Sequence, residues 1–300
     1  MKDKSMDKRD RFSEYNPIVN LIFYLGALVY SMIYMHPLFL AISFLGATSY
    51  YLTIQQKKAF KLIFLMFPLV ILIACINPIF STGGNTVLFY LWDRPYTLEA
   101  IIYGAIGGAT FGAVVIWFAT FNYIMTSDKL IYLFGAWIPN ISMVFTMVLR
   151  FLPTYKRKLR GISTARQCIG KSKDSGKKKE RIANGLTEIS ALTSQALENG
   201  IVTADSMKSR GFGSGERKSF SLYTIKKRDV IFIVVFILII ILLAGCGIKG
   251  GMDASFIPQV SLQWNSYTFA GALLYGTMLF VPTILNVTED IVWNFSKSKI

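Results

Sequence analysis

The chain has 300 residues, of which 53% are hydrophobic and 16% are charged, and its mean hydropathy is +0.46. Soluble domains of this length carry more charge and lack long uncharged runs, so the composition predicts an all-α integral membrane protein embedded in a lipid bilayer. The formal net charge is +15, but Lys and Arg gather at the ends of apolar segments without interleaved aromatic residues, which excludes nucleic acid as the expected partner.

Six apolar segments follow a charged N-terminal tail, and they predict about six transmembrane helices. About 20 apolar residues cross the hydrocarbon core as a helix. The predicted tail, expected to be mobile, covers residues 1–16, and the predicted spans cover residues 17–35, 38–54, 62–80, 98–125, 230–248 and 268–287. The connections 81–97 and 249–267 are expected to be loops, the first a polar one with Trp92 at the membrane interface.

A long basic segment separates the fourth and fifth spans. The chain is therefore expected to divide into a tail at residues 1–16, spans one to four at 17–128, an interfacial segment and arm at 129–229, and C-terminal spans at 230–300. Residues 129–139 are too few for a span and are expected to form an interfacial or re-entrant helix.

The distribution of positive charge predicts the orientation. With the N-terminus inside and six spans, every Lys and Arg except Arg94 and Lys249 falls on the cytoplasmic side. The clusters at 57–61 and 226–228 lie next to span ends, where the positive-inside rule counts them. Both termini and the arm are therefore expected in the cytoplasm.

The fourth apolar segment carries Gly104, Gly108 and Gly112 at four-residue spacing. Glycines at this spacing fall along one helix face, and the lack of Cβ atoms lets another helix approach closely. Two uses remain open from the sequence, namely packing inside the bundle and docking of a separate membrane subunit.

The arm is expected to contain two amphipathic coupling helices joined by a flexible, charge-rich turn at residues 171–180. Apolar residues recur on one face of each, at Met143, Met147, Phe151 and Tyr155 in the first and at Ile182, Leu186 and Ile189 in the second. Each helix carries an arginine near its end, Arg166 and Arg210, and Gly211 is expected to stop the second. Spacing alone is equally compatible with a protein interface and with solvated or headgroup-facing charge.

Residues that carry out chemistry are missing from the expected places. Glu99, Glu289 and Asp290 lie at span edges and no acid lies at the centre of a span, which argues against an ion-driven transporter and against a membrane enzyme. The three cysteines have no CxxC spacing and His36 is the single histidine, so no catalytic residue, metal site or cofactor is expected.

A short stretch imitates a nucleotide site. Gly170-Lys171-Ser172 looks like the end of a phosphate-binding loop, but Ala165 stands where that loop requires its first glycine. Nucleotide chemistry is therefore expected in a partner and not in this chain.

Three stretches resemble the T component of energy-coupling factor (ECF) transporters. They are residues 204–213, with Ser209-Arg210-Gly211, residues 149–167, with Leu149-Arg150-Phe151-Leu152-Pro153 and Thr164-Ala165-Arg166-Gln167, and the entry to the fourth span at 96–104. The resemblance is strongest over the arm and weak over the last span. Gln167 and Ser209 depart from the usual Gly and Ala of the family's motifs.

That resemblance implies a non-catalytic scaffold in a bacterial plasma membrane. It would hold two cytoplasmic ABC-type ATPases and one membrane substrate-binding (S) component for a vitamin or metal ion. The implied ATPase-coupling residues are Ala165, Arg166, Gln167, Ser209, Arg210 and Gly211. An always-charged guanidinium suits pairing with carboxylates at such an interface. The alternative is a self-contained permease or channel in which the arm is a regulatory domain.

Overall fold

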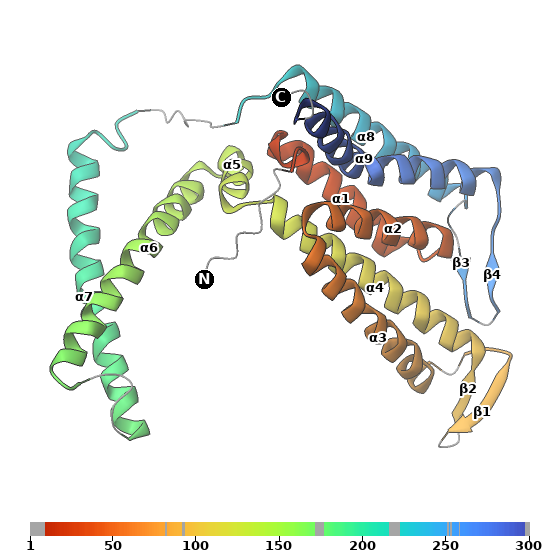
Figure 1. Cartoon of the computed structure of the whole chain (residues 1–300), viewed down its shortest axis with the longest axis horizontal. Coiled ribbons are helices and arrows are strands. Elements are labelled where there is room, and N and C mark those ends of the chain that lie inside the picture. The colour runs from red at the N-terminus through yellow and green to blue at the C-terminus, as the bar shows by residue number, and fades with distance from the viewer. Residues whose placement is uncertain are drawn as a thin grey trace. The chain divides into compact units, whose positions relative to one another are not determined.

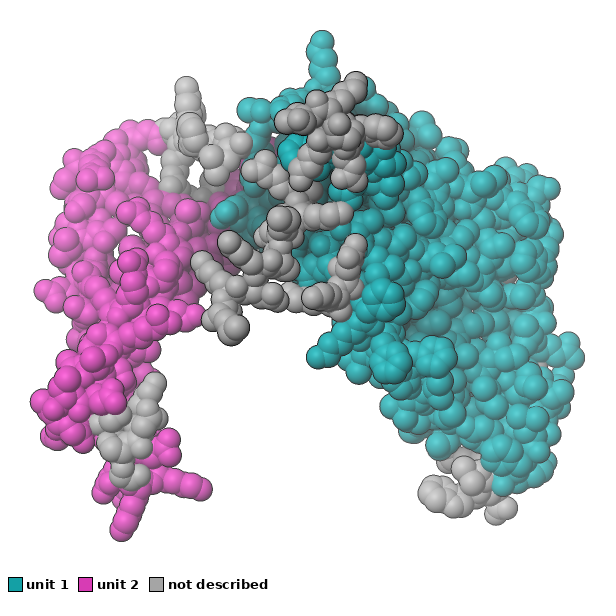
Figure 2. Space-filling view, in the orientation of Figure 1, with its two compact units in different colours: residues 1–130, 223–300 teal, residues 131–222 magenta. Residues whose placement is uncertain are grey.

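The computed structural model describes residues 10–81, 83–91, 94–171, 177–215, 223–250, 252, 254–257 and 259–297. The chain forms two compact units (Figure 2). Unit 1 comprises residues 1–130 and 223–300, and unit 2 comprises residues 131–222. Residues 1–9 of the predicted tail, Trp92, and residues 172–176 of the predicted turn lie outside the described residues.

Unit 1 is a helical bundle (Figure 1). Its helices are η1 (Phe12–Glu14), α1 (Pro17–Ile33), α2 (Pro37–Ile54), α3 (Gln56–Phe80), α4 (Leu98–Ile124), α8 (Lys227–Ile248) and α9 (Ser266–Lys297). By length and composition, α2, α3, α4, α8 and α9 could each cross a membrane, whereas the apolar α1 has only 17 residues. The fold class agrees with the prediction of a multi-pass, all-α membrane protein. The number of spans differs, because the described residues contain five helices of spanning length and six spans were predicted.

Local sequence explains where the first two long helices begin. The Asn16 side chain accepts a hydrogen bond from the Ile18 amide at 3.0 Å, and Pro17 occupies the first helical position of α1. His36 does the same for α2, its Nδ1 accepting from the Leu38 amide at 3.3 Å. Each cap satisfies a backbone donor that the helix itself leaves unpaired.

The core of unit 1 is centred on aromatic side chains. Trp117 of α4 is fully buried, and its ring centroid lies 5.7 Å from that of Phe23 of α1. The Trp117 indole donates to Ser43 Oγ of α2 at 3.1 Å, so the only polar atom of this side chain is satisfied. Phe23 also contacts Phe236 of α8 at 5.7 Å. These contacts join four helices around one layer of rings.

Two antiparallel hairpins occupy the connections that were expected to be loops. Strands β1 (Val87–Leu91) and β2 (Arg94–Thr97) pair between α3 and α4, and β3 (Ala254–Ser255) pairs with β4 (Ser261–Leu262) between α8 and α9. The expectation of a polar loop over residues 81–97 was wrong, because the apolar and aromatic residues of Val87–Leu91 suit a paired strand and the Phe89 and Tyr96 rings stack at 4.6 Å. In the connection 249–267, two-residue strands pair where a loop was expected. Both hairpins lie at the same end of unit 1 (Figure 1).

Unit 2 contains two long helices packed against each other, α6 (Pro139–Cys168) and α7 (Lys178–Ser209). The short helix expected near 129–139 is α5 (Ser127–Trp137), which begins in unit 1 and continues into unit 2. Lys178 and Lys179 belong to the first turn of α7, so the expectation that the flexible turn extends to residue 180 was wrong. The Glu180 side chain favours this earlier start, since its carboxylate accepts from the Lys177 amide at 3.1 Å.

Candidate functional site

Arg210 stands at the exposed end of α7. Gly211 follows it with φ +77°, the Gly211 amide donates to the Lys208 carbonyl at 3.0 Å, and the Phe212 amide donates to the Met207 carbonyl at 3.0 Å. This is a Schellman ending, in which glycine adopts a backbone conformation that other residues reach only with strain. The stop predicted at Gly211 is therefore confirmed. Within the described residues, the Arg210 guanidinium has neither an ion pair nor a hydrogen bond.

Arg166 occupies a different environment in the last turn of α6. Its side chain is 18% exposed, and its Nε lies 4.0 Å from Oε1 of Glu188, a carboxylate that is 4% exposed. The Nη2 atom donates to Asn184 Oδ1 at 3.1 Å. Both partners belong to α7, so this arginine holds the end of α6 against the beginning of α7. The two arginines that looked equivalent in the sequence thus have different surroundings.

The remaining motif residues lie on the surface of unit 2. Ala165 and Gln167 flank Arg166 and are exposed. Ser209 is also exposed, and its hydroxyl donates to the Asp205 carbonyl one turn earlier, at 2.9 Å. Both motifs therefore present exposed side chains on either side of, or next to, their arginine.

The two motifs are far apart along α7. Arg166 contacts this helix at Asn184 and Glu188, whereas Arg210 follows its last residue. With a rise of 1.5 Å per residue, these points are separated by roughly 35 Å. The two motifs therefore lie on separate parts of the surface of unit 2.

Apolar side chains are exposed along both helices of unit 2. They are Ile141, Val144, Phe145, Val148 and Leu152 on α6, and Ile182, Leu186, Ile189, Leu197, Ile201 and Val202 on α7. Each of these side chains is at least 49% exposed. Unit 2 therefore combines a charged helix end with apolar helix faces.

The glycine stripe of α4 packs against α3. A Cβ atom on Gly104 would lie 3.0 Å from Ala74 Cα, and one on Gly108 would lie 3.1 Å from Val70 Cα. Gly112 is looser, since a Cβ there would first meet Met66 Cβ at 3.8 Å. The sequence left open whether this glycine face packs inside the bundle or docks a separate subunit. In the structure, α3 of the same chain packs against it.

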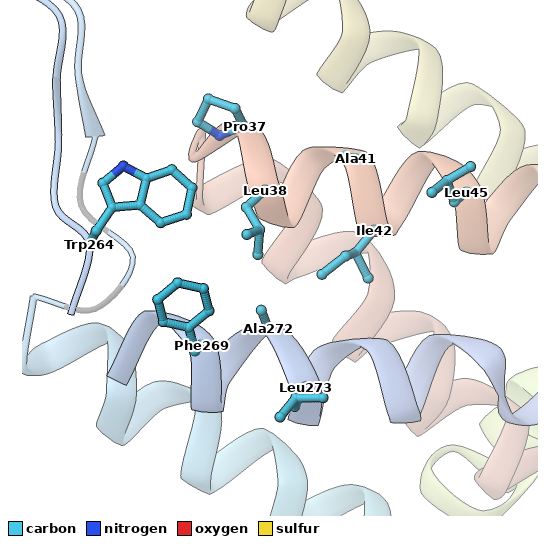
Figure 3. Close-up of a pocket in the computed structure, with 9 residues that line it drawn as sticks. All are labelled: Pro37, Leu38, Ala41, Ile42, Leu45, Trp264, Phe269, Ala272 and Leu273. Carbon is cyan, nitrogen blue, oxygen red and sulfur yellow. The ribbon is translucent and has the colours of Figure 1, made fainter. Parts of the chain in front are cut away.

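An apolar hollow of about 790 Å³ lies between α2 and α9 (Figure 3). It is lined by Pro37, Leu38, Ala41, Ile42, Leu45, Trp264, Phe269, Ala272 and Leu273. Trp264 and Phe269 lie at one end of it and Leu45 at the other (Figure 3). Small-molecule sites usually combine an apolar wall with a few convergent polar groups, and this lining supplies no carboxylate, amide or hydroxyl to orient a polar substrate.

The acid at the beginning of α4 and the single histidine both have structural roles. Glu99 in the first turn of α4 is buried, and its carboxylate accepts from the Thr86 amide at 3.1 Å and the Thr86 hydroxyl at 2.5 Å. It therefore ties the residue that precedes β1 to the first turn of α4. His36 is buried as the cap of α2. The part of the chain that the structure describes contains no group of three or more His, Cys, Asp or Glu placed to hold a metal ion.

A buried polar network was missed by the sequence reasoning. The expectation of a mobile tail is wrong for residues 10–16, since Asp10, Phe12, Tyr15 and Asn16 are all buried. The Lys129 amine is also buried and donates to the Ser13 carbonyl at 2.5 Å and to its hydroxyl at 2.8 Å. Two aromatic residues, at 12 and 15, inside a charged tail were the signal that could have predicted this burial.

The network holds two groups of opposite charge. Burial lowers the pKa of the Lys129 amine to about 8, while the negative charge of Asp10 acts in the opposite direction. Burial raises the pKa of Asp10, and hydrogen bonds from Asn286, Tyr50 and Ser13 oppose that rise. Since a pKa of about 8 lies above neutrality, the lysine is mostly charged at pH 7.

Comparison with known protein families and with curated proteins finds no match to this chain.

We expect Arg166→Ala and Glu188→Ala each to loosen the contact between α6 and α7. The first removes the hydrogen bond to Asn184 together with the positive charge near the buried Glu188 carboxylate, and the second removes that carboxylate. Losing a hydrogen bond that involves a charged group costs about 1.5–3 kcal/mol. Hydrogen–deuterium exchange of the full-length chain should show faster exchange near residues 178–190 in both variants. Since the two side chains act together, the double variant should lose less than the sum of the single losses. Strictly additive losses, or losses equal to those of the exposed control Lys178→Ala, would contradict the pairing.

Proposed function

We propose that this chain is the transmembrane coupling subunit of an ECF-type ABC importer in a bacterial plasma membrane. In this proposal, unit 2 is the cytoplasmic arm, and both termini are cytoplasmic. Two ABC-type ATPases bind unit 2, and a membrane S component binds the vitamin or metal ion. Movement of the ATPases during their ATP cycle displaces unit 2 and, through it, the substrate-binding subunit.

The observation that carries the proposal is the exposed Arg210 at the Schellman ending of α7, roughly 35 Å along that helix from the second arginine motif. A guanidinium on a rigid helix end, without a partner in the described part of its own chain, is suited to pair with a carboxylate on another protein. The separation matches two partner subunits. At the other motif, Ala165 and Gln167 supply the exposed contact surface while Arg166 braces it from behind.

The surroundings of the bundle fit the same role. The apolar hollow lacks polar groups to orient a substrate, which agrees with selectivity residing in another subunit. Both hairpins lie at one end of unit 1 (Figure 1), as expected if residues 81–97 and 249–267 face outward. The buried hydroxyls of Ser31 and Tyr275 bond to each other at 3.0 Å and need no substrate to satisfy them.

Purification of the tagged full-length chain from its native membrane tests the proposal. A coupling subunit should retain two copies of an ATP-hydrolysing subunit, or one copy each of two, together with a small membrane protein. The preparation should hydrolyse ATP, while the chain purified alone should not bind it. A chain that purifies alone and supports uptake in vesicles by itself would instead establish the permease.

A further inference from the structure

The segment Asp10–Asn16 contacts Lys129, next to the end of the first part of unit 1, and the first turns of α8, which follow the return of the chain to unit 1. The chain leaves unit 1 after Leu130, inside α5, and returns to it at Tyr223, just before α8. On the departing side, Lys129 donates to the carbonyl and hydroxyl of Ser13. Lys129 is only 4% exposed and stands one residue before the boundary of the units.

On the returning side, the contact is made by Tyr15. The guanidinium of Arg228 lies 4.8 Å from the centre of the Tyr15 ring, and the Phe232 ring lies 5.0 Å from it in an edge-on arrangement. Both residues belong to the first turns of α8. Cation–π and edge-on aromatic contacts of this kind are stabilising. One short segment therefore holds the beginning of α8 as well as the beginning of α5.

The segment is itself fixed to the bundle. Asp10 accepts hydrogen bonds from the Tyr50 hydroxyl of α2 at 3.1 Å and from the side-chain amide of Asn286 of α9. The amide of Arg11 donates back to Asn286 Oδ1 at 3.1 Å. Phe12 is fully buried, with its ring 5.1 Å from that of Phe23 of α1. Three helices of unit 1 thus anchor the segment that holds the two connections.

Burying a lysine amine destabilises the fold, because the charged group loses its hydration. An apolar side chain at position 129 would pack at lower cost. The amine, however, can reach a particular carbonyl and a particular hydroxyl with directional hydrogen bonds, which apolar contacts cannot specify. A polar group at such a place fixes geometry at the expense of stability.

We propose that residues 10–16 are the joint through which displacement of unit 2 reaches the bundle, with Ser13 holding the departing connection and Tyr15 the returning one. Without the joint, the two connections bend independently and the displacement is lost in them. Its role in transport rests on the proposed function, whereas its mechanical effect does not.

Electron–electron distance measurements on the full-length chain in lipid nanodiscs test the joint. The native cysteines are replaced by alanine, and spin labels are attached at Gly107→Cys in α4 and Ser194→Cys in α7, both outside the network. Lys129→Met and, separately, Tyr15→Leu should broaden the distance distribution by about twofold or more, because each frees one connection. The matched control Lys156→Met, which removes an exposed lysine of α6, should leave it unchanged.

Thermal unfolding followed by tryptophan fluorescence shows whether each variant is folded. If Lys129→Met is too unstable to measure, Tyr15→Leu still tests the joint, because it leaves the buried lysine in place. Unchanged distributions in a folded variant would overturn the joint, whether or not ATPases bind the chain. Broadening in a chain that retains no ATPase would support the joint and defeat the proposed function. In a complex that does retain them, broadening should accompany at least a fivefold or so loss of uptake per ATP hydrolysed. Full coupling despite broadening would refute the role in transmission.

Discussion

Arg210→Ala is expected to weaken binding of an ATPase to the full-length chain by roughly thirty-fold to several-thousand-fold. Truncating one member of a buried charge pair at a protein interface costs about 2–5 kcal/mol, because the other charge is left buried and alone. A solvated surface arginine contributes on the order of 1 kcal/mol or less. Since Arg210 has no partner in the described part of its own chain, the loss should appear in partner binding and not in the fold.

The measurement is retention of the ATPases during purification, together with ATP-driven uptake in reconstituted vesicles. Lys178→Ala, an exposed cation in the first turn of the same helix, is the matched control and should retain both activities. Arg166→Ala should also impair docking of the ATPases. Unlike Arg210→Ala, it should in addition loosen the packing between α6 and α7. Parental binding and uptake by the Arg210 variant would remove the basis of the coupling proposal.

Gly108→Leu is expected to prevent normal assembly of unit 1. A Cβ atom at this position would lie 3.1 Å from Val70 Cα and 3.2 Å from the Val70 carbonyl oxygen. These are backbone atoms, so α3 must move as a whole before a leucine fits. Overpacking costs typically about 1–3 kcal/mol even where side chains can adjust, and more is expected where backbone must shift.

Gly107→Leu provides a control on the preceding residue, since a Cβ there meets nothing within 4 Å. Size-exclusion profiles and thermal unfolding in detergent should separate the two, with Gly108→Leu aggregated or strongly destabilised and Gly107→Leu close to the parent. If Gly108→Leu instead folds normally and loses only a membrane partner, the glycine face is a docking surface after all.

The sequence alone determined the features that depend on composition and on neighbouring residues. Apolar length identifies the membrane helices because the hydrocarbon thickness fixes how many residues are needed. Helix ends are local as well, since Asn16 caps α1 through its own side chain and Gly211 ends α7 through its own backbone conformation. The resemblance that motivated the functional proposal also rests on short, continuous stretches.

Only the tertiary structure decided which distant residues meet. Ser13 and Lys129 are 116 positions apart, so no periodicity in the sequence could place that amine on that carbonyl. The same holds for Arg166. Its motif resembles that of Arg210 in the sequence, but in the structure Glu188 of another helix lies beside it. The glycine spacing predicted a close helix–helix contact, but only the folded structure identifies α3 as the helix that makes it. Local patterns determine which surfaces a helix offers, and the folded chain determines which of them it covers itself.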